Sequence, residues 1–166
     1  MKGKAIKYNE KNLNTDLIIP ARYLVDSNPD HLAEHCMEDL DPDFKQKVEK
    51  NNYTLMVADS NFGCGSSREQ APIALKAAGI QCIIAPSYAR IFFRNAINIG
   101  LPIVEFKEIE ALNTDDELVI DFERGILNNL TSNNEFKIKK MPHFLQELIS
   151  IGGLTNFARN KILEIK

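Results

Sequence analysis

The middle of the chain alternates short apolar runs with helical patterns, and this order constrains the fold more than any other feature. The apolar and helical segments follow one another in the order 55–58, 68–78, 82–85, 88–99 and 103–106. The two helical patterns end at Gly79 and Gly100, as glycine commonly ends helices. Such an order predicts parallel strands joined by crossover helices. The carboxyl ends of those strands share one edge of the sheet, where α/β proteins bind ligands.

The N-terminal segments predict additional elements. Lys4–Tyr8 is typical of a strand, 12–16 of a polar turn, and Leu17–Ile19 of a short apolar strand that Pro20 stops. The polar stretch 28–52 predicts one or two surface helices, with Pro29 and Pro42 near their starts.

The C-terminal third changes in style. Residues 117–122 and 135–139 alternate between apolar and polar, which predicts a half-exposed antiparallel segment. We expect turns at 128–129 and 133–134, and two short helices at 142–151 and 155–165. The sequence therefore predicts an α/β fold with a mixed sheet and flanking helices, in one domain that spans residues 1–166.

Composition excludes several classes of function. The net charge of −3 offers no basic footprint for nucleic acid or an anionic membrane. No apolar run approaches the roughly 20 residues of a membrane span, and no apolar segment follows the basic residues at the N-terminus. We therefore expect a cytoplasmic protein that binds neither nucleic acid nor membrane.

The cysteines and histidines predict no metal or cofactor site in this chain. The cysteines, Cys36, Cys64 and Cys82, lack any C-x-x-C spacing. His31 and His35 are four residues apart and share a helix face with Glu34 and Cys36, so a metal site there competes with a plain polar surface. We favour the polar surface, because the spacing offers no third ligand.

A glycine-rich junction, Phe62-Gly-Cys-Gly-Ser-Ser-Arg-Glu69, stands between a predicted strand and a predicted helix. Glycine lets the backbone approach a ligand, and the first N–H groups of a helix lack internal partners, so this is a general design for an anion site. The guanidinium of Arg68 suits a carboxylate. Neither a P-loop nor a dinucleotide fingerprint is present. A capping box formed by Ser67 and Gln70 is an equally good interpretation.

Two other polar clusters belong to the same predicted edge. Pro86–Asn95 follows a strand and opens a helix, with Arg90 and Arg94 on one face. Asn14–Asp16 and the loop 20–26 offer polar groups that could close over a ligand. Spacing alone leaves an ordinary amphipathic helix and an ordinary loop as the competing interpretations.

Three segments together resemble a known family. Asn14-Thr-Asp-Leu-Ile-Ile-Pro20, the junction 62–69 and Ser87-Tyr-Ala-Arg-Ile-Phe-Phe-Arg-Asn95, in this order, are similar to the small subunits of 3-isopropylmalate dehydratase. The resemblance covers nearly the whole chain and is closest to the compact archaeal-type subunits. It implies the swivelling β/β/α domain that corresponds to the fourth domain of aconitase.

The resemblance also implies roles for individual residues. Ser66 would be the base that removes a proton from carbon, and Ser67 and Arg68 would hold a substrate carboxylate. The segment that selects the substrate corresponds to Arg22, Tyr23, Leu24, Val25 and Asp26. Residues that would shape the site without contacting the substrate are Thr15, Asp16, Gly63, Gly65, Glu69 and Arg90. Many relatives have His where this chain has Gln70, so the set of side chains that can carry a proton at the site differs here.

The reaction implied is the interconversion of 2-isopropylmalate and 3-isopropylmalate in leucine biosynthesis. A [4Fe–4S] cluster would sit in a separate large subunit, in a heterodimer or heterotetramer, and this chain would bind no cofactor. Relatives that act on homocitrate-type substrates tend to have arginine at the position of Val25, so valine favours isopropylmalate over homoaconitate. Citraconate and dimethylmalate remain alternative substrates, and a stand-alone anion- or nucleotide-binding module is an alternative of another class.

Overall fold

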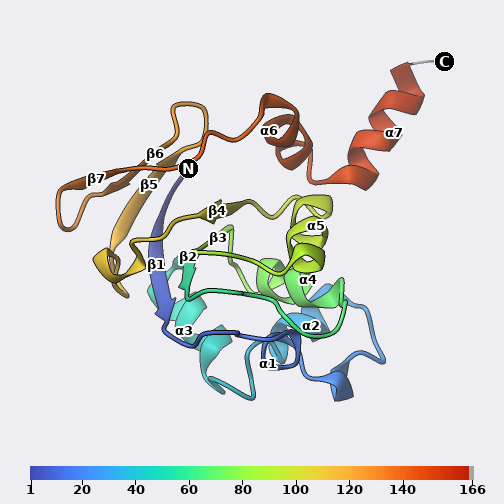
Figure 1. Ribbon diagram of the computed structural model, residues 1–166. Coiled ribbons are helices and arrows are strands. Elements are labelled where there is room, and N and C mark those ends of the chain that lie inside the picture. The colour runs from blue at the N-terminus through green and yellow to red at the C-terminus, as the bar shows by residue number, and fades with distance from the viewer. Residues whose placement is uncertain (165–166) are drawn as a thin grey trace.

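A computed structural model describes residues 1–164 (Figure 1). The strands are β1 (Lys2–Tyr8), β2 (Tyr53–Ala58), β3 (Cys82–Ala85), β4 (Ile103–Glu105), β5 (Glu117–Asp121), β6 (Ile126–Asn129) and β7 (Asn134–Lys137). The α-helices are α1 (Thr15–Ile18), α2 (Pro29–Glu34), α3 (Phe44–Asn51), α4 (Gln70–Ala77), α5 (Arg90–Asn98), α6 (His143–Ser150) and α7 (Leu154–Glu164). Two short 3₁₀ turns are η1 (Ala21–Tyr23) and η2 (Ile109–Ala111).

All seven strands form one mixed sheet in the order β4-β3-β2-β1-β5-β6-β7. Strands β1 to β4 pair in parallel, and β5 to β7 continue the sheet in antiparallel pairs. The predicted order of strand, helix and strand is confirmed. The carboxyl ends of β1, β2 and β3 therefore lie side by side at one edge, and the loops that leave them meet there.

The parallel strands are buried on both faces. Ile6, Met56 and Ile83 point into the larger core, which packs against helices, whereas the neighbouring residues Leu55 and Ile84 point into a second core. The second core is closed by apolar side chains of β5 and β6 and of the segment around η2. Burial on both faces explains why these strands have continuous apolar runs instead of alternation.

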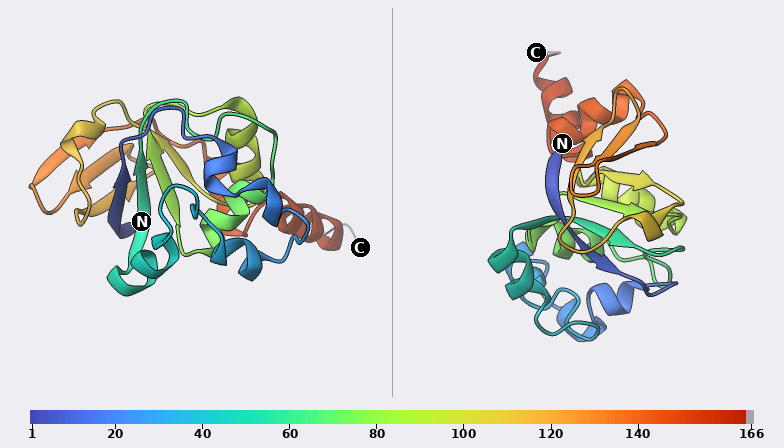
Figure 2. Two further views of the ribbon diagram at one scale, coloured as in Figure 1. Left: turned by 90° about the horizontal axis from the view of Figure 1, so that it is seen from below. Right: turned by 90° about the vertical axis from the view of Figure 1, so that its left-hand side faces the viewer.

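The antiparallel ribbon and the last helix lie at opposite ends of the molecule. Figures 1 and 2 show β5 to β7 extending from one end of the sheet and α7 projecting beyond α5 and α6 at the other. The helices predicted in the tail are confirmed as α6 and α7, and the predicted end at Ile165 lies outside the described residues.

The predicted strand at Leu17–Ile19 is wrong, because Leu17 and Ile18 belong to the short helix α1 and Ile19 is its C-cap. The Asn14 side chain accepts a hydrogen bond from the Leu17 N–H over 2.9 Å, and Asp16 lies in the first turn. This cap favours a helical turn over the extended form that β-branched side chains prefer. The chain returns to an extended conformation at Ile19.

The turn predicted at Asn128-Asn129 is also wrong, because both residues belong to β6. Asn129 is fully buried and donates from its amide to Asp116 over 2.7 Å, which satisfies both polar groups inside the protein. The actual turn before β6 ends at Gly125, whose φ of +71° favours glycine. The turn at Asn133 is confirmed by its φ of +59°.

The polar stretch 28–52, predicted to hold one or two helices, contains α2 and α3. Each has an exposed polar face and an apolar face that is buried in the larger core, with Leu32 and Ala33 from α2 and Phe44 and Val48 from α3. Among the described residues, no helix is both long and apolar enough to cross a membrane.

Candidate functional site

The junction between β2 and α4 is held by backbone hydrogen bonds to two other segments. The Phe62 N–H donates to the Ser87 carbonyl over 3.0 Å, and the Ala89 N–H donates to the Phe62 carbonyl over 2.9 Å. On the other side, the Gly63 N–H donates to Leu13 over 2.8 Å. The junction therefore lies between the loop after β1 and the loop after β3, as the sheet topology requires.

Two glycines let the junction take this path. Gly63 has φ of +73°, and a Cβ there would lie 2.2 Å from the ring of Phe92, which is buried on α5. Gly65 has φ of +94° and approaches the Thr15 hydroxyl. Gly63 thus permits close packing of the junction on α5, and Gly65 turns the chain toward Ser66.

Thr15 holds the segment that carries the two serines. Its N–H donates to the Cys64 carbonyl over 2.8 Å, and its hydroxyl donates to the Ser66 carbonyl over 3.0 Å. Ser66 and Ser67 are exposed, and within residues 1–164 neither hydroxyl makes a hydrogen bond. The backbone is fixed while both hydroxyls stay available to a ligand.

Arg68 connects the junction to the N-terminal segment. Its Nη1 donates to Asp16 over 2.6 Å and to the Ile19 carbonyl over 3.2 Å. The Arg68 side chain is 13% exposed, whereas that of Asp16 is 54% exposed. The guanidinium of the residue that follows the serines is thus fixed against α1, with Nη2 left without a protein partner among the described residues.

Of the two interpretations of the junction, the capping box of Ser67 is wrong. Helix α4 begins at Gln70, its N-cap is Glu69, and no side chain caps it. Pro72 therefore falls in the first turn, where proline is tolerated. The first turn follows the serines after Arg68 and Glu69, and its N–H groups have no side-chain cap, as the anion-binding interpretation requires.

Arg22 and Tyr23 are engaged with the segment that follows α2. The Arg22 guanidinium donates to Glu38 over 3.1 Å and to Asp39, and lies 4.6 Å from the centre of the Tyr23 ring. The Tyr23 hydroxyl donates to Glu38 over 2.7 Å, and His35 contacts the same carboxyl group over 2.6 Å. The hydrogen bonds from His35 and then Tyr23 lower the pKa of Glu38. Both η1 side chains are therefore anchored.

The residues after η1 are presented to solvent. Val25 is 91% exposed, and Asp26 accepts a hydrogen bond from the Asn28 N–H over 2.8 Å in a local turn. Leu24 is half-buried against the larger core. Val25 is thus free to contact a ligand or a partner.

The remaining predicted residues lie at the same edge. Glu69 is exposed at the start of α4, and Arg90 is exposed at the start of α5, two residues after the Tyr88 that pairs with Phe62. The Tyr88 hydroxyl faces inward and donates to the carbonyls of Ile83 and Val104.

The three thiols do not form a ligand set for a metal cluster. Cys36 and Cys82 are fully within the protein, and burial raises the pKa of both. The Cys64 thiol contacts the Asn12 carbonyl over 3.2 Å. Among the described residues, two thiols are thus buried and the third contacts a backbone carbonyl, an arrangement that does not suit the ligands of an iron–sulfur cluster.

Sequence reasoning missed Glu38, which accepts hydrogen bonds from three side chains. It also missed the pair of amides, Asn12 and Asn61, that joins two loops over 2.8 Å. The only signal for Glu38 was the acidic pair Glu38-Asp39 opposite the single basic residue of the loop, Arg22.

The chain is similar to known proteins over nearly its full length. The model of the aconitase C-terminal domain matches residues 2–109. A 3-isopropylmalate dehydratase small subunit of Caldanaerobacter subterraneus is 55% identical over 98% of this chain and 99% of its own. A 2,3-dimethylmalate dehydratase small subunit of Eubacterium barkeri is 52% identical over 94% of both chains.

A solved structure agrees with these relatives. The crystal structure of 3-isopropylmalate dehydratase from Methanocaldococcus jannaschii superposes with a TM-score of 0.89 at 40% identity, over 98% of this chain and 95% of that chain. The fold of this chain is thus that of the solved relative. The chain belongs to the aconitase C-terminal domain family and, within it, to the 3-isopropylmalate dehydratase small subunits.

Proposed function

We propose that the chain is the small subunit of a hydro-lyase that interconverts 2-isopropylmalate and 3-isopropylmalate in leucine biosynthesis, in the cytoplasm. Its relatives named for this reaction support the proposal. The observation that carries it is the exposed Ser66 hydroxyl on a backbone fixed by Thr15, next to Arg68 and the start of α4.

Ser66 acts as the base. As an alkoxide, its oxygen takes the proton from the carbon that neighbours the hydroxyl-bearing carbon. The electron pair of that C–H bond forms the double bond, and the C–O bond breaks with loss of hydroxide, which a Lewis acid in the partner would accept. For the return, hydroxide adds to the carbon that lost the proton, and the Ser66 hydroxyl gives its proton to the other carbon. Serine is a weak base, so its oxyanion needs stabilisation, which the positive end of α4 and the Arg68 guanidinium supply.

Ser67 and Arg68 bind a substrate carboxylate. The free Nη2 of Arg68 and the Ser67 hydroxyl provide donors for two carboxylate oxygens. Asp16 keeps the guanidinium in place, and the exposed Arg90 adds positive charge at the same edge. Gly63 and Gly65 support this arrangement by allowing the path of the backbone, and Glu69 supports it as the N-cap of α4.

The site is completed by a large subunit that docks over this edge. When bound there, a [4Fe–4S] cluster with an open iron would supply a Lewis acid for the departing hydroxyl. The described thiols do not suit such a cluster, so we place it in the partner. The work of this chain is to place the base and the carboxylate donors.

Val25 and its neighbours Leu24 and Asp26 select the substrate. An apolar side chain suits an isopropyl group, while its lack of charge leaves a third carboxylate, as in homoaconitate, without an ionic partner. The Eubacterium barkeri relative makes dimethylmalate the second candidate. A comparison of kcat/KM for isopropylmalate, dimethylmalate, citraconate and homoaconitate decides, and a preference for the tricarboxylate would contradict the role of Val25.

The test of the base is Ser66→Ala in a complex with a cluster-loaded large subunit. We expect turnover to fall by more than about 10³-fold, on the scale of losing an essential acid–base group, while Ser67→Ala mainly raises KM. Normal turnover of Ser66→Ala would show that another group removes the proton. Calorimetric binding of phosphate by the chain alone, without a partner, would instead favour the anion-binding module.

A further inference from the structure

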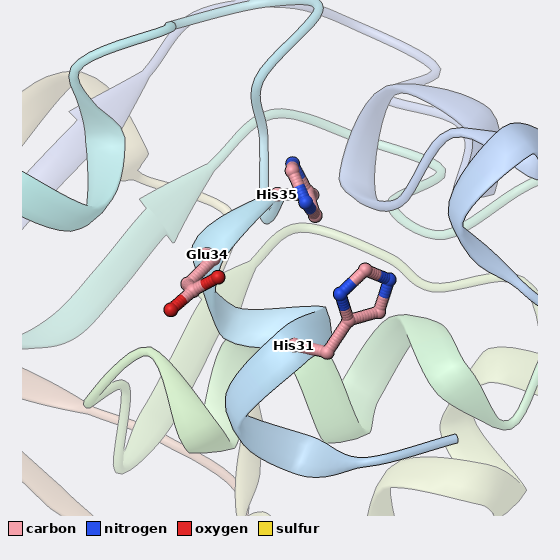
Figure 3. Close-up of side chains that lie close together, drawn as sticks. All are labelled: His31, Glu34 and His35. Atoms are coloured by element: carbon pink, nitrogen blue, oxygen red, sulfur yellow. The ribbon is translucent and has the colours of Figure 1, made fainter. Parts of the chain in front are cut away.

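The end of α2 brings together three metal-binding side chains that belong to no part of the proposed catalytic site. His31, Glu34 and His35 come from one helical turn, and one ligand atom of each lies within 4.8 Å of the others (Figure 3). Glu34 is exposed, and the two imidazoles are half-buried with ring centres 5.0 Å apart. Glu34, which sequence spacing already puts on this helix face, is therefore the candidate third ligand.

The separation of the three atoms is close to that of a coordinated set. Zinc bonds to imidazole and carboxylate are about 2.0–2.2 Å long, so ligand atoms of a tetrahedral site lie roughly 3.5 Å apart. Rotation of the exposed Glu34 side chain and small ring adjustments close the remaining gap. Two nitrogens and one oxygen suit zinc-like ions better than Mg²⁺ or Ca²⁺, which prefer oxygen.

The His31 imidazole is available to a ligand, because it makes no hydrogen bond within residues 1–164. Its Nε2 is buried without a partner. Figure 3 shows that Nδ1 is the nitrogen on the side of Glu34 and His35, so a cation in this cluster would bind Nδ1.

His35 is oriented as metal-bound histidines are. Glu38 contacts Nδ1 over 2.6 Å, which leaves Nε2 as the nitrogen for a cation, and the Tyr23 ring stacks flat on the imidazole with centres 3.6 Å apart. A carboxylate behind a histidine fixes its tautomer and strengthens it as a ligand. We propose that His31, Glu34 and His35 bind one divalent first-row metal ion of the zinc type, with water in the remaining position.

This site does not depend on the proposed function. Its consequence is structural, because a bound ion would hold the His31 and His35 rings in place. The Tyr23 ring of η1 packs against both of these rings. Binding to the folded state alone also stabilises it, so the melting temperature of the chain should rise with zinc concentration.

The test is titration of the metal-free chain with Zn²⁺ by calorimetry and with Co²⁺ by visible absorption. We expect one ion per chain and a cobalt spectrum without a sulfur-to-metal band. Replacing a ligand, in His31→Gln or Glu34→Gln, should weaken binding by more than about 100-fold, and Glu38→Gln by about 10-fold. The control is His143→Gln, which removes the exposed histidine of α6 and should bind as the wild type does.

Glu34→Gln keeps the test decisive if His31→Gln does not fold, because Glu34 is exposed and makes no hydrogen bond among the described residues. Equal binding by wild type and Glu34→Gln would overturn the proposal. So would zinc binding that Cys64→Ser abolishes, since it would place the ion at the thiol beside the junction.

Discussion

The Thr15 hydroxyl donates to the Ser66 carbonyl over 3.0 Å, so the helix after β1 fixes the backbone of a residue fifty-one positions later. Thr15 is 2% exposed, so its own side chain is held inside the protein. Removing the hydroxyl takes away the protein partner of the Ser66 carbonyl and lets the serine segment move.

Thr15→Val should lower kcat about fivefold while KM changes little. The substitution preserves shape and removes one hydrogen bond worth about 1 kcal/mol, which is about a factor of five in rate if it is expressed in the transition state. Steady-state kinetics of the reconstituted complex measure it. Thr15→Ser keeps the hydroxyl and should retain most activity; equal loss in both variants would assign the effect to packing.

Arg68→Lys should lower kcat/KM by at least about tenfold, because a lysine ammonium cannot contact Asp16 and a carboxylate with a planar fork. Asp16→Asn should have a smaller effect, since the Asp16 side chain is half exposed and the Ile19 carbonyl still holds the guanidinium. Measuring kcat/KM of the two variants in parallel checks that the loss is larger in Arg68→Lys than in Asp16→Asn. A larger loss in Asp16→Asn would mean that the carboxylate itself contacts the substrate.

Gly63→Ala should destabilise the chain far more than Gly65→Ala. Both need a positive φ, which costs alanine about 1 kcal/mol, but only at Gly63 would the methyl group overlap an aromatic ring, at 2.2 Å from Phe92. We expect a difference of about 2 kcal/mol or more in the free energy of unfolding, measured in urea. Equal stabilities would show that α5 shifts freely away from the junction.

Val25→Arg should change substrate preference without changing stability. The side chain is 91% exposed, so the free energy of unfolding should stay within about 0.5 kcal/mol. Activity on isopropylmalate should fall, and activity on a tricarboxylate should rise relative to it. Val25→Leu is the size-matched apolar control, and loss of preference there too would argue against a charge effect.

Glu38→Gln should reduce the loss of stability that the wild type shows in acid. The pKa of Glu38 is lowered in the folded chain, by the hydrogen bond from His35 and then that from Tyr23. Its contribution to stability is therefore complete above the unfolded pKa of about 4.3 and is lost as pH falls through the lower folded pKa.

Urea unfolding at several pH values from neutral to acid measures this difference. Glu110→Gln is the control, because Glu110 is exposed and has no ion pair among the described residues. Parallel acid curves for wild type and Glu38→Gln would show that the three hydrogen bonds to Glu38 do not bear on stability.

The sequence was sufficient to predict the parallel half of the sheet and the meeting of the three segments at one edge. Both follow from the order of apolar runs, because neighbouring parallel strands bring their following loops together. It was not sufficient at Leu17–Ile19, where a single Asn14 cap outweighs the β preference of two isoleucines. It also could not find the bonds of Glu38 to Arg22 and Tyr23, because ion pairs between distant residues leave no periodic pattern.

The parallel bridges of Phe62 with Tyr88 and of Asn14 with Cys64 extend strand-like pairing into the loops. Surface loops usually accept insertions, but an extra residue between Phe62 and Cys64 would shift one bridge out of register with the other. Relatives of this chain can therefore vary in length after Val25, where only a local turn must be rebuilt, far more easily than at the junction.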